Sequence, residues 1–173
     1  MSGYYCSRMD ISSGWDEKEQ DVKDIEAAID IDASPERVWG ILTDLPSYVL
    51  WNPFIHRAYG LVQMGEKIEV HMKLPGAEES TFFPTITLME PCRELRWSGH
   101  LYVAGLFDRE QDFRIEPLGE DRVHFVQREG FTGVLVQLIM PKLEDAVRQG
   151  MEAMNMALKE RAEAPAIPEH KAA

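Results

Sequence analysis

The chain has 173 residues, of which 45% are hydrophobic and 28% charged, and this composition fits one globular domain with a sizeable core rather than a disordered chain. Its formal net charge of −12 repels phosphate backbones and anionic lipid headgroups, so we expect no nucleic acid partner and no basic membrane tether. No apolar run approaches the roughly 18 residues needed to cross a bilayer, which predicts no integral membrane association.

Few features of the sequence indicate a redox or metal centre. The cysteines Cys6 and Cys92 have no CxxC neighbour, and no two histidines have a spacing such as HExxH. The first residues also lack the cationic and apolar regions of a signal peptide. We therefore expect a cytoplasmic protein with no metal and no cofactor.

Composition shifts predict three segments. Residues 1–23 are polar and irregular, and we expect a flexible N-terminal extension. Residues 24–163 carry the periodic patterns of a folded domain. Residues 164–173 contain two prolines among alanines, which predicts a flexible tail.

The domain opens with a strand and two short helices. Residues 25–31 alternate apolar and acidic side chains, the pattern of a half-buried strand. Ser34 followed by Pro35 is typical of a helix start, and Pro46 stops that helix. A second short helix or turn covers residues 47–51 and ends at Asn52 and Pro53.

Six further strands and a long helix follow. Strand patterns cover residues 55–62, 68–74, 82–89, a stretch around Leu95 and Trp97, 106–115 and 123–129. Turn residues between them favour hairpins and therefore antiparallel neighbours. From residue 134 to about 163 the apolar positions change to helical spacing, with Pro141 predicted to kink the helix or mark its regular start. The fold class is α+β, a seven-stranded antiparallel sheet (β-α-α-β6-α) against a long C-terminal helix.

Several motifs resemble one superfamily. Residues 31–39, with Ala33-Ser34-Pro35-Glu36, and residues 44–54, with Trp51-Asn52-Pro53-Phe54, are similar to the entry segments of the START-like, polyketide cyclase-related (SRPBCC) proteins. Residues 90–97, 105–108, 129–133 and the long helix continue the similarity, in particular to a bacterial branch related to polyketide cyclase. The resemblance implies a helix-grip fold, in which a curved sheet wraps around the C-terminal helix and encloses an apolar cavity. It also places glutamines, Gln111 and Gln127, where relatives often carry histidine.

The inner face of the sheet and the apolar stripe of the helix are expected to line this cavity. If Phe113 faces inward, alternation directs Arg109 and Gln111 inward as well, and Phe125 does the same for Gln127 and Glu129. The predicted ligand-binding set is Trp51, Phe54, Met72, Phe82, Trp97, Arg109, Gln111, Phe113, Phe125, Gln127, Glu129, Leu143, Val147, Met151 and Met154.

The polar members of this set have two interpretations. Arg109, Gln111, Gln127 and Glu129 form a cluster that orients a ligand, or Arg109 and Glu129 form an ion pair while the amides satisfy strand ends. Glu129 and Arg109 are also the only candidate catalytic residues that the sequence offers, since it contains no G-x-S-x-G elbow, no P-loop and no dinucleotide fingerprint.

Three functions follow as hypotheses. The first is binding or transport of a small hydrophobic molecule such as a lipid, a polyketide or an isoprenoid-like compound. The second is a cyclase, aromatase or dehydratase that moves a proton with an inward polar residue. The third is a protein-interaction module with a closed cavity. The two glutamines favour binding over catalysis, and a homodimer remains an open alternative.

Overall fold

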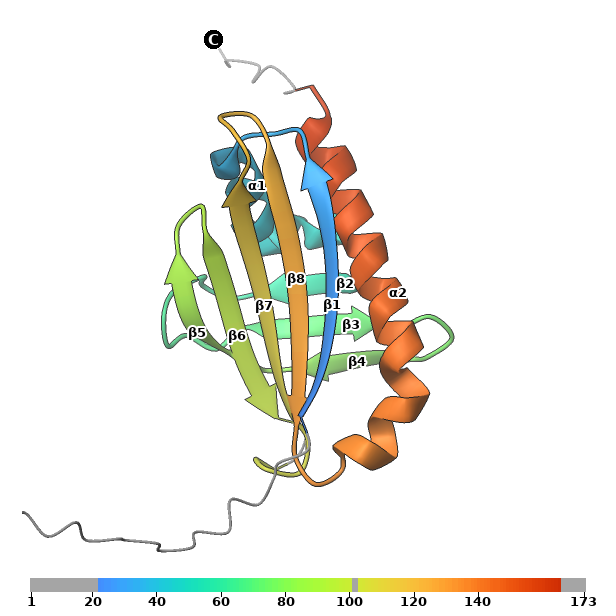
Figure 1. Ribbon diagram of the computed structural model, residues 1–173. Coiled ribbons are helices and arrows are strands. Elements are labelled where there is room, and N and C mark those ends of the chain that lie inside the picture. The colour runs from blue at the N-terminus through green and yellow to red at the C-terminus, as the bar shows by residue number, and fades with distance from the viewer. Residues whose placement is uncertain (1–21, 101–102, 166–173) are drawn as a thin grey trace, which may run out of the picture.

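The computed structural model describes residues 22–100 and 103–165. Along the chain, one strand is followed by two short helices, seven strands and a long helix (Figure 1). The elements are β1 (Val22–Ile31), α1 (Pro35–Thr43), the 3-10 helix η1 (Leu45–Leu50), β2 (Ile55–Tyr59), β3 (Glu69–Lys73), β4 (Glu79–Phe82), β5 (Thr85–Glu90), β6 (Glu94–His100), β7 (Asp108–Pro117), β8 (Val123–Thr132) and α2 (Val136–Glu163).

The strands form two sheets. The large sheet is antiparallel and has the order β1-β8-β7-β6-β5, and the small sheet has the order β2-β3-β4. The strands of the small sheet cross behind those of the large one (Figure 1). An isolated bridge between Lys67 and Thr85 and a hydrogen bond of 2.9 Å from Ile68 N to Pro84 O join the two sheets. The curved surface expected of a helix-grip fold is therefore made from two sheets.

Pro84 separates β4 from β5. The sequence pattern predicted one strand over residues 82–89, and the structure has two strands there, which gives eight strands in place of the predicted seven. Proline has no N–H to donate to a strand ladder and restricts the residue before it, so pairing stops at this point. The chain can then change from one sheet to the other.

The turn from α1 through η1 into β2 is fixed by local hydrogen bonds. The side chain of Ser34 accepts from Arg37 N at 3.4 Å, which caps α1 as predicted. Tyr48 donates its hydroxyl proton to Leu42 O at 2.6 Å. Asn52 Oδ1 accepts from the backbone N–H groups of Phe54 and Ile55, at 3.0 and 2.8 Å. These contacts bring the side chain of Phe54 into the core.

Helix α2 has 28 residues and lies along the edge formed by β1. Its lower end turns away from the axis of the rest of the helix, and Pro141 lies inside this first part (Figure 1). Near the other end, Arg37 donates to the carbonyls of Ala162 and Ala164, and Lys159 donates to Asp30 O at 2.8 Å. Cations at a helix C-terminus interact favourably with the helix dipole. Among the described residues, no helix is both long and apolar enough to cross a membrane.

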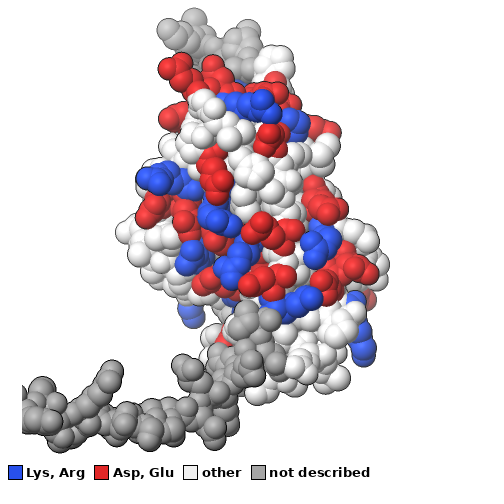
Figure 2. Space-filling view, in the orientation of Figure 1, with Lys and Arg blue, Asp and Glu red and all other residues white. Residues whose placement is uncertain are grey.

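The outer face of the large sheet carries interspersed acidic and basic side chains (Figure 2). One row across four strands places Arg96, Asp112, Arg128 and Glu26 opposite one another. The alternation of β-strands therefore directs the charges to this face and the apolar residues to the other. Of the expected extension, residues 1–23, the first 21 lie outside the described residues, and Val22 and Lys23 belong to β1. Of the expected tail, residues 164–173, those from 166 onward lie outside the described residues.

Candidate functional site

The inner face of the large sheet has one row in which polar residues interrupt an apolar set. Ile25, Glu129, Gln111, Trp97 and Ile86 lie opposite one another in five successive strands. Glu129 is 0% exposed and Gln111 is 1% exposed, so both polar side chains point away from solvent. A buried polar group without a partner destabilises the fold, which makes these two residues informative.

Arg109 and Glu129 form an ion pair through Arg109 Nε. The side chain of Arg109 is 15% exposed and that of Glu129 is 0% exposed. Arg109 lies two residues before Gln111 on β7 and opposite Phe131 on β8. The sequence left open whether Arg109 and Glu129 pair with each other or face a ligand. The structure pairs them and still leaves Arg109 Nη2 and Glu129 Oε2 without a partner in the described part of the chain.

Two aromatic rings enclose the guanidinium of Arg109. Its Cζ lies 5.1 Å from the centroid of Phe82 and 6.0 Å from the centroid of Phe131. Burial lowers the pKa of Arg109 to about 9, so the group is still charged at neutral pH. The cation is thus held by a carboxylate on one side and by ring faces on the others.

A cavity of about 320 Å³ lies beside this ion pair. Its apolar walls come from the β3–β4 hairpin, from the large sheet and from α2. The wall residues are Met72, Leu74, Phe82, Phe107, Phe131, Ile139, Leu143 and Val147. Arg109 and Glu129 supply the polar part of the lining. Ligand pockets in proteins are commonly about 300–1,000 Å³ and mostly apolar with a few polar groups, so this cavity suits a small ligand.

The cavity reaches the protein surface at the β3–β4 hairpin. Ala77, Glu78, Ser80 and Thr81 line it there, and all four residues are exposed. A molecule therefore has an entrance between this hairpin and α2.

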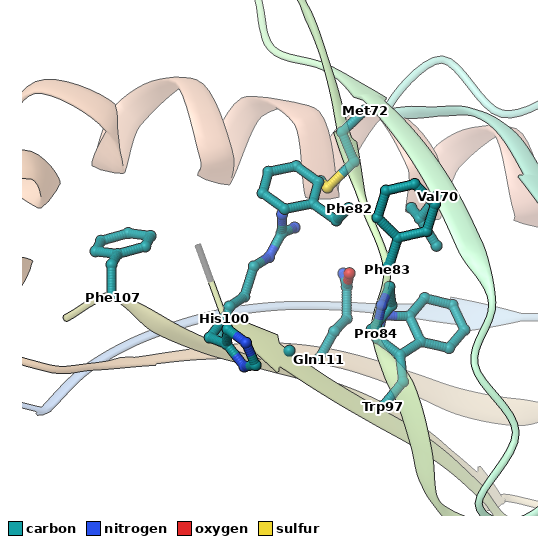
Figure 3. Close-up of a pocket in the computed structure, with 11 residues that line it drawn as sticks. Val70, Met72, Phe82, Phe83, Pro84, Trp97, His100, Phe107 and Gln111 are labelled. Atoms are coloured by element: carbon teal, nitrogen blue, oxygen red, sulfur yellow. The ribbon is translucent and has the colours of Figure 1, made fainter. Parts of the chain in front are cut away.

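A smaller hollow of about 30 Å³ adjoins the cavity. The two share Met72, Phe82, Phe107 and Arg109, so the side chain of Arg109 lies at their boundary. Gln111 lines only the smaller hollow, together with Trp97, Phe83 and other residues (Figure 3). The amide of Gln111 points from β7 into this hollow, and neither its oxygen nor its nitrogen has a partner among the described residues.

Eight of the fifteen predicted ligand-binding residues line one of the two spaces. These are Met72, Phe82, Trp97, Arg109, Gln111, Glu129, Leu143 and Val147. The others do not. Phe54, Phe113, Phe125, Gln127, Met151 and Met154 are 0% exposed and belong to the solid part of the core. Gln127 Nε2 lies 3.7 Å from Met154 Sδ. Trp51 lines a separate surface crevice together with Asn52 and His56.

Some cavity residues were missing from the predicted set. Phe131 has the same strand phase as Glu129, so alternation would have found it. Ile139 belongs to the helical stripe, and its spacing from Leu143 would have found it. Phe107 lies in the predicted strand 106–115 with the same phase as Arg109, so alternation would have found it as well. The hairpin residues 77 and 78 lie outside strands, where no periodic pattern marks a position.

The fold and the cavity together define a class. An antiparallel sheet that holds a long C-terminal helix over an apolar cavity is the helix-grip arrangement, as the motifs implied. A family model described as "Polyketide cyclase / dehydrase and lipid transport" matches residues 23–163. The chain belongs to this family, which confirms the resemblance seen in the sequence.

Solved structures share the fold. The Zhui aromatase/cyclase from Streptomyces sp. R1128 superposes with a TM-score of 0.69 at 20% identity, covering 83% of this chain and 94% of that one. A START superfamily protein from Mycobacterium smegmatis gives 0.65 at 20% identity, with 81% and 97% covered. A truncated norcoclaurine synthase from Thalictrum flavum gives 0.62 at 14% identity, with 84% and 96% covered. No curated protein sequence matches this chain.

Proposed function

We propose that the protein binds or carries a small, mostly apolar molecule in the cavity between the sheets and α2. The observation that carries this proposal is the cavity of about 320 Å³, which has apolar walls from three parts of the fold and an entrance at the β3–β4 hairpin. Burial of apolar ligand surface against such walls supplies the binding free energy. A lipid, a polyketide or an isoprenoid-like compound has the required chemistry.

The open entrance also bears on the protein-interaction alternative. That hypothesis requires a closed cavity, whereas exposed hairpin residues line this one. The binding proposal therefore makes better use of the observed geometry.

A cyclase, aromatase or dehydratase activity is the second candidate. Glu129 lines the cavity, and its Oε2 has no partner among the described residues, so one carboxylate oxygen is available to a substrate. The other oxygen pairs with Arg109. A general base role is compatible with this pairing. Incubation with a poly-β-ketone thioester analogue, with product analysis by mass spectrometry, distinguishes turnover from simple binding; turnover that is lost in Glu129→Gln would establish the enzyme.

A cavity-filling substitution tests the binding proposal. Leu143→Trp places an indole in the cavity, whereas Leu138→Trp introduces the same change on the exposed side of α2, where residue 138 is 67% exposed. With a fluorescent apolar probe such as anilinonaphthalene sulfonate and with neutral lipid and aromatic panels in native mass spectrometry, we expect binding to the wild type and to Leu138→Trp. Leu143→Trp should lose it. Equal binding by all three proteins would place the ligand elsewhere and refute the proposal.

A further inference from the structure

We infer that Gln111 is a specificity-determining residue, which selects ligands whose inner end is a small neutral group that both donates and accepts a hydrogen bond, such as a hydroxyl. This inference rests on the proposed function and names the chemistry of the ligand for the same site. Its basis is the position of an unpaired buried amide in the hollow beyond Arg109.

Among the residues that the structure describes, the amide of Gln111 has no hydrogen-bond partner. Its neighbours in the inner row are Trp97 on β6 and Glu129 on β8. Trp97 is a wall of the same hollow, and one oxygen of the Glu129 carboxylate pairs with Arg109. An amide has two donor protons and an acceptor oxygen, and leaving them unpaired inside the protein is unfavourable. A ligand group or a water in the hollow would satisfy them.

The size of the hollow limits what can enter. A volume of about 30 Å³ admits only a group about the size of two or three waters, because one water needs roughly 10–15 Å³ on this scale. The apolar body of the ligand must therefore stay in the larger cavity, on the other side of Arg109. Only a small functional group fits beside Gln111, which lies about 7 Å further along β7 than Arg109.

The charges around the hollow exclude an ionised head group. Arg109 and Glu129 neutralise each other, so the pair leaves no net charge to balance. A carboxylate head would stand close to Glu129 in a desolvated space, and an ammonium would stand close to Arg109. A hydroxyl adds no charge, and it can donate to Gln111 Oε1 while it accepts from Gln111 Nε2 or from Arg109 Nη2.

Three probes of one shape separate these chemistries: naphthalene, 2-naphthol and 2-naphthoate. For the wild type we expect 2-naphthol to bind at least about tenfold more tightly than either of the others, measured by calorimetry or by displacement of a fluorescent apolar probe. Gln111→Leu should bind naphthalene as well as the wild type does and should lose the preference for 2-naphthol. Gln111→Met provides a second apolar replacement, and thermal unfolding confirms that each variant is folded.

Gln127→Leu is the matched control. Gln127 is also a buried glutamine on the inner face of the large sheet, 0% exposed, but it lines neither space. We expect Gln127→Leu to keep the wild-type preference. An unchanged preference in Gln111→Leu and Gln111→Met, or tighter binding of 2-naphthoate or naphthalene to the wild type, would overturn the role of Gln111 while leaving the cavity as a binding site. If none of the three probes binds the wild type, the proposed function itself fails.

Discussion

Apolar residues of α2 face the sheet along the whole helix, but the two ends of this interface are packed differently. Toward the C-terminal half of α2, Met151, Met154 and Leu158 are 0% exposed and line neither of the two spaces. Toward its N-terminal half, Ile139 and Leu143 are only partly buried and line the open space. The same helix therefore packs solidly at one end and leaves a hollow at the other.

Two features account for this difference. At the packed end, Gly150 lets the ring of Phe54 approach the helix, since a Cβ at residue 150 would lie 2.3 Å from Phe54 Cδ2. At the hollow end, the inner face carries the ion pair of Arg109 and Glu129 in place of two apolar side chains. A polar pair needs hydrogen-bonding partners, and apolar side chains packed closely against it would leave its remaining polar atoms unsatisfied. Function can therefore be placed at one end while the other end stabilises the fold.

The largest effect is expected where the hollow end depends on its ion pair. Arg109→Met leaves Glu129 buried without its cation, and loss of one partner of a buried pair costs about 3–5 kcal/mol of unfolding free energy. Urea unfolding of the single variant and of the double variant Arg109→Met/Glu129→Met measures this. The double variant should regain most of the stability, because no unpaired charge remains. A double variant as unstable as the single one would show that the pair matters for reasons other than charge compensation.

Truncation of a helix residue at each end compares the two kinds of packing directly. Met151→Ala creates a new cavity in a solid core and should cost roughly 2–5 kcal/mol. Leu143→Ala only enlarges an existing space, and it should cost about 1 kcal/mol, mainly from lost contacts with the remaining wall. Chemical denaturation of both variants tests the ranking. Equal losses of unfolding free energy would mean that Leu143 is packed as tightly as Met151.

Gly150→Ala tests the packed end by adding a methyl group. The short distance to Phe54 means that the ring or the helix must shift, and overpacking of this kind costs about 1–3 kcal/mol. Alanine also favours the helix by about 0.5–1 kcal/mol, so we expect a net loss of up to about 2.5 kcal/mol in the free energy of unfolding. The double variant Gly150→Ala/Phe54→Leu should show coupling between the two sites, and strictly additive effects would contradict the proposed contact.

The sequence predicts which residues face this interface, but it does not predict which of them line the hollow. Strand alternation correctly indicates that Arg109, Gln111 and Glu129 share the inner face, and helical spacing correctly indicates α2. These patterns depend only on which side chains avoid water. They do not distinguish Phe113, in solid core, from Gln111, two residues away and beside a hollow. That distinction depends on where the β3–β4 hairpin lies, which follows from the break at Pro84 and from loop residues such as Phe107.

The outer face of the same strands offers a second buried carboxylate for comparison with Glu129. Asp112 is 3% exposed and has Arg96 Nη2 and Arg114 Nε at 3.6 and 3.7 Å, too far for strong ion pairs. Burial, with a contribution from Glu94, raises the pKa of Asp112. A carboxyl whose pKa is raised in the folded state binds protons more tightly there than when unfolded. Its favourable contribution is therefore present at acid pH and is lost as pH rises through the folded pKa.

Asp112→Asn removes the loss of folding stability that Asp112 causes as the pH rises. At neutral pH we expect the variant to be as stable as the wild type or more stable by up to about 1 kcal/mol, and we expect this advantage to shrink as the pH falls toward the ordinary range of aspartate. Thermal unfolding of both proteins between acid and neutral pH measures the difference. Glu94→Gln should produce a smaller change of the same sign, because it lessens the repulsion felt by Asp112 while leaving that side chain buried. A variant that loses stability at neutral pH relative to acid pH would show instead that the arginines Arg96 and Arg114 hold Asp112 firmly in its ionised form.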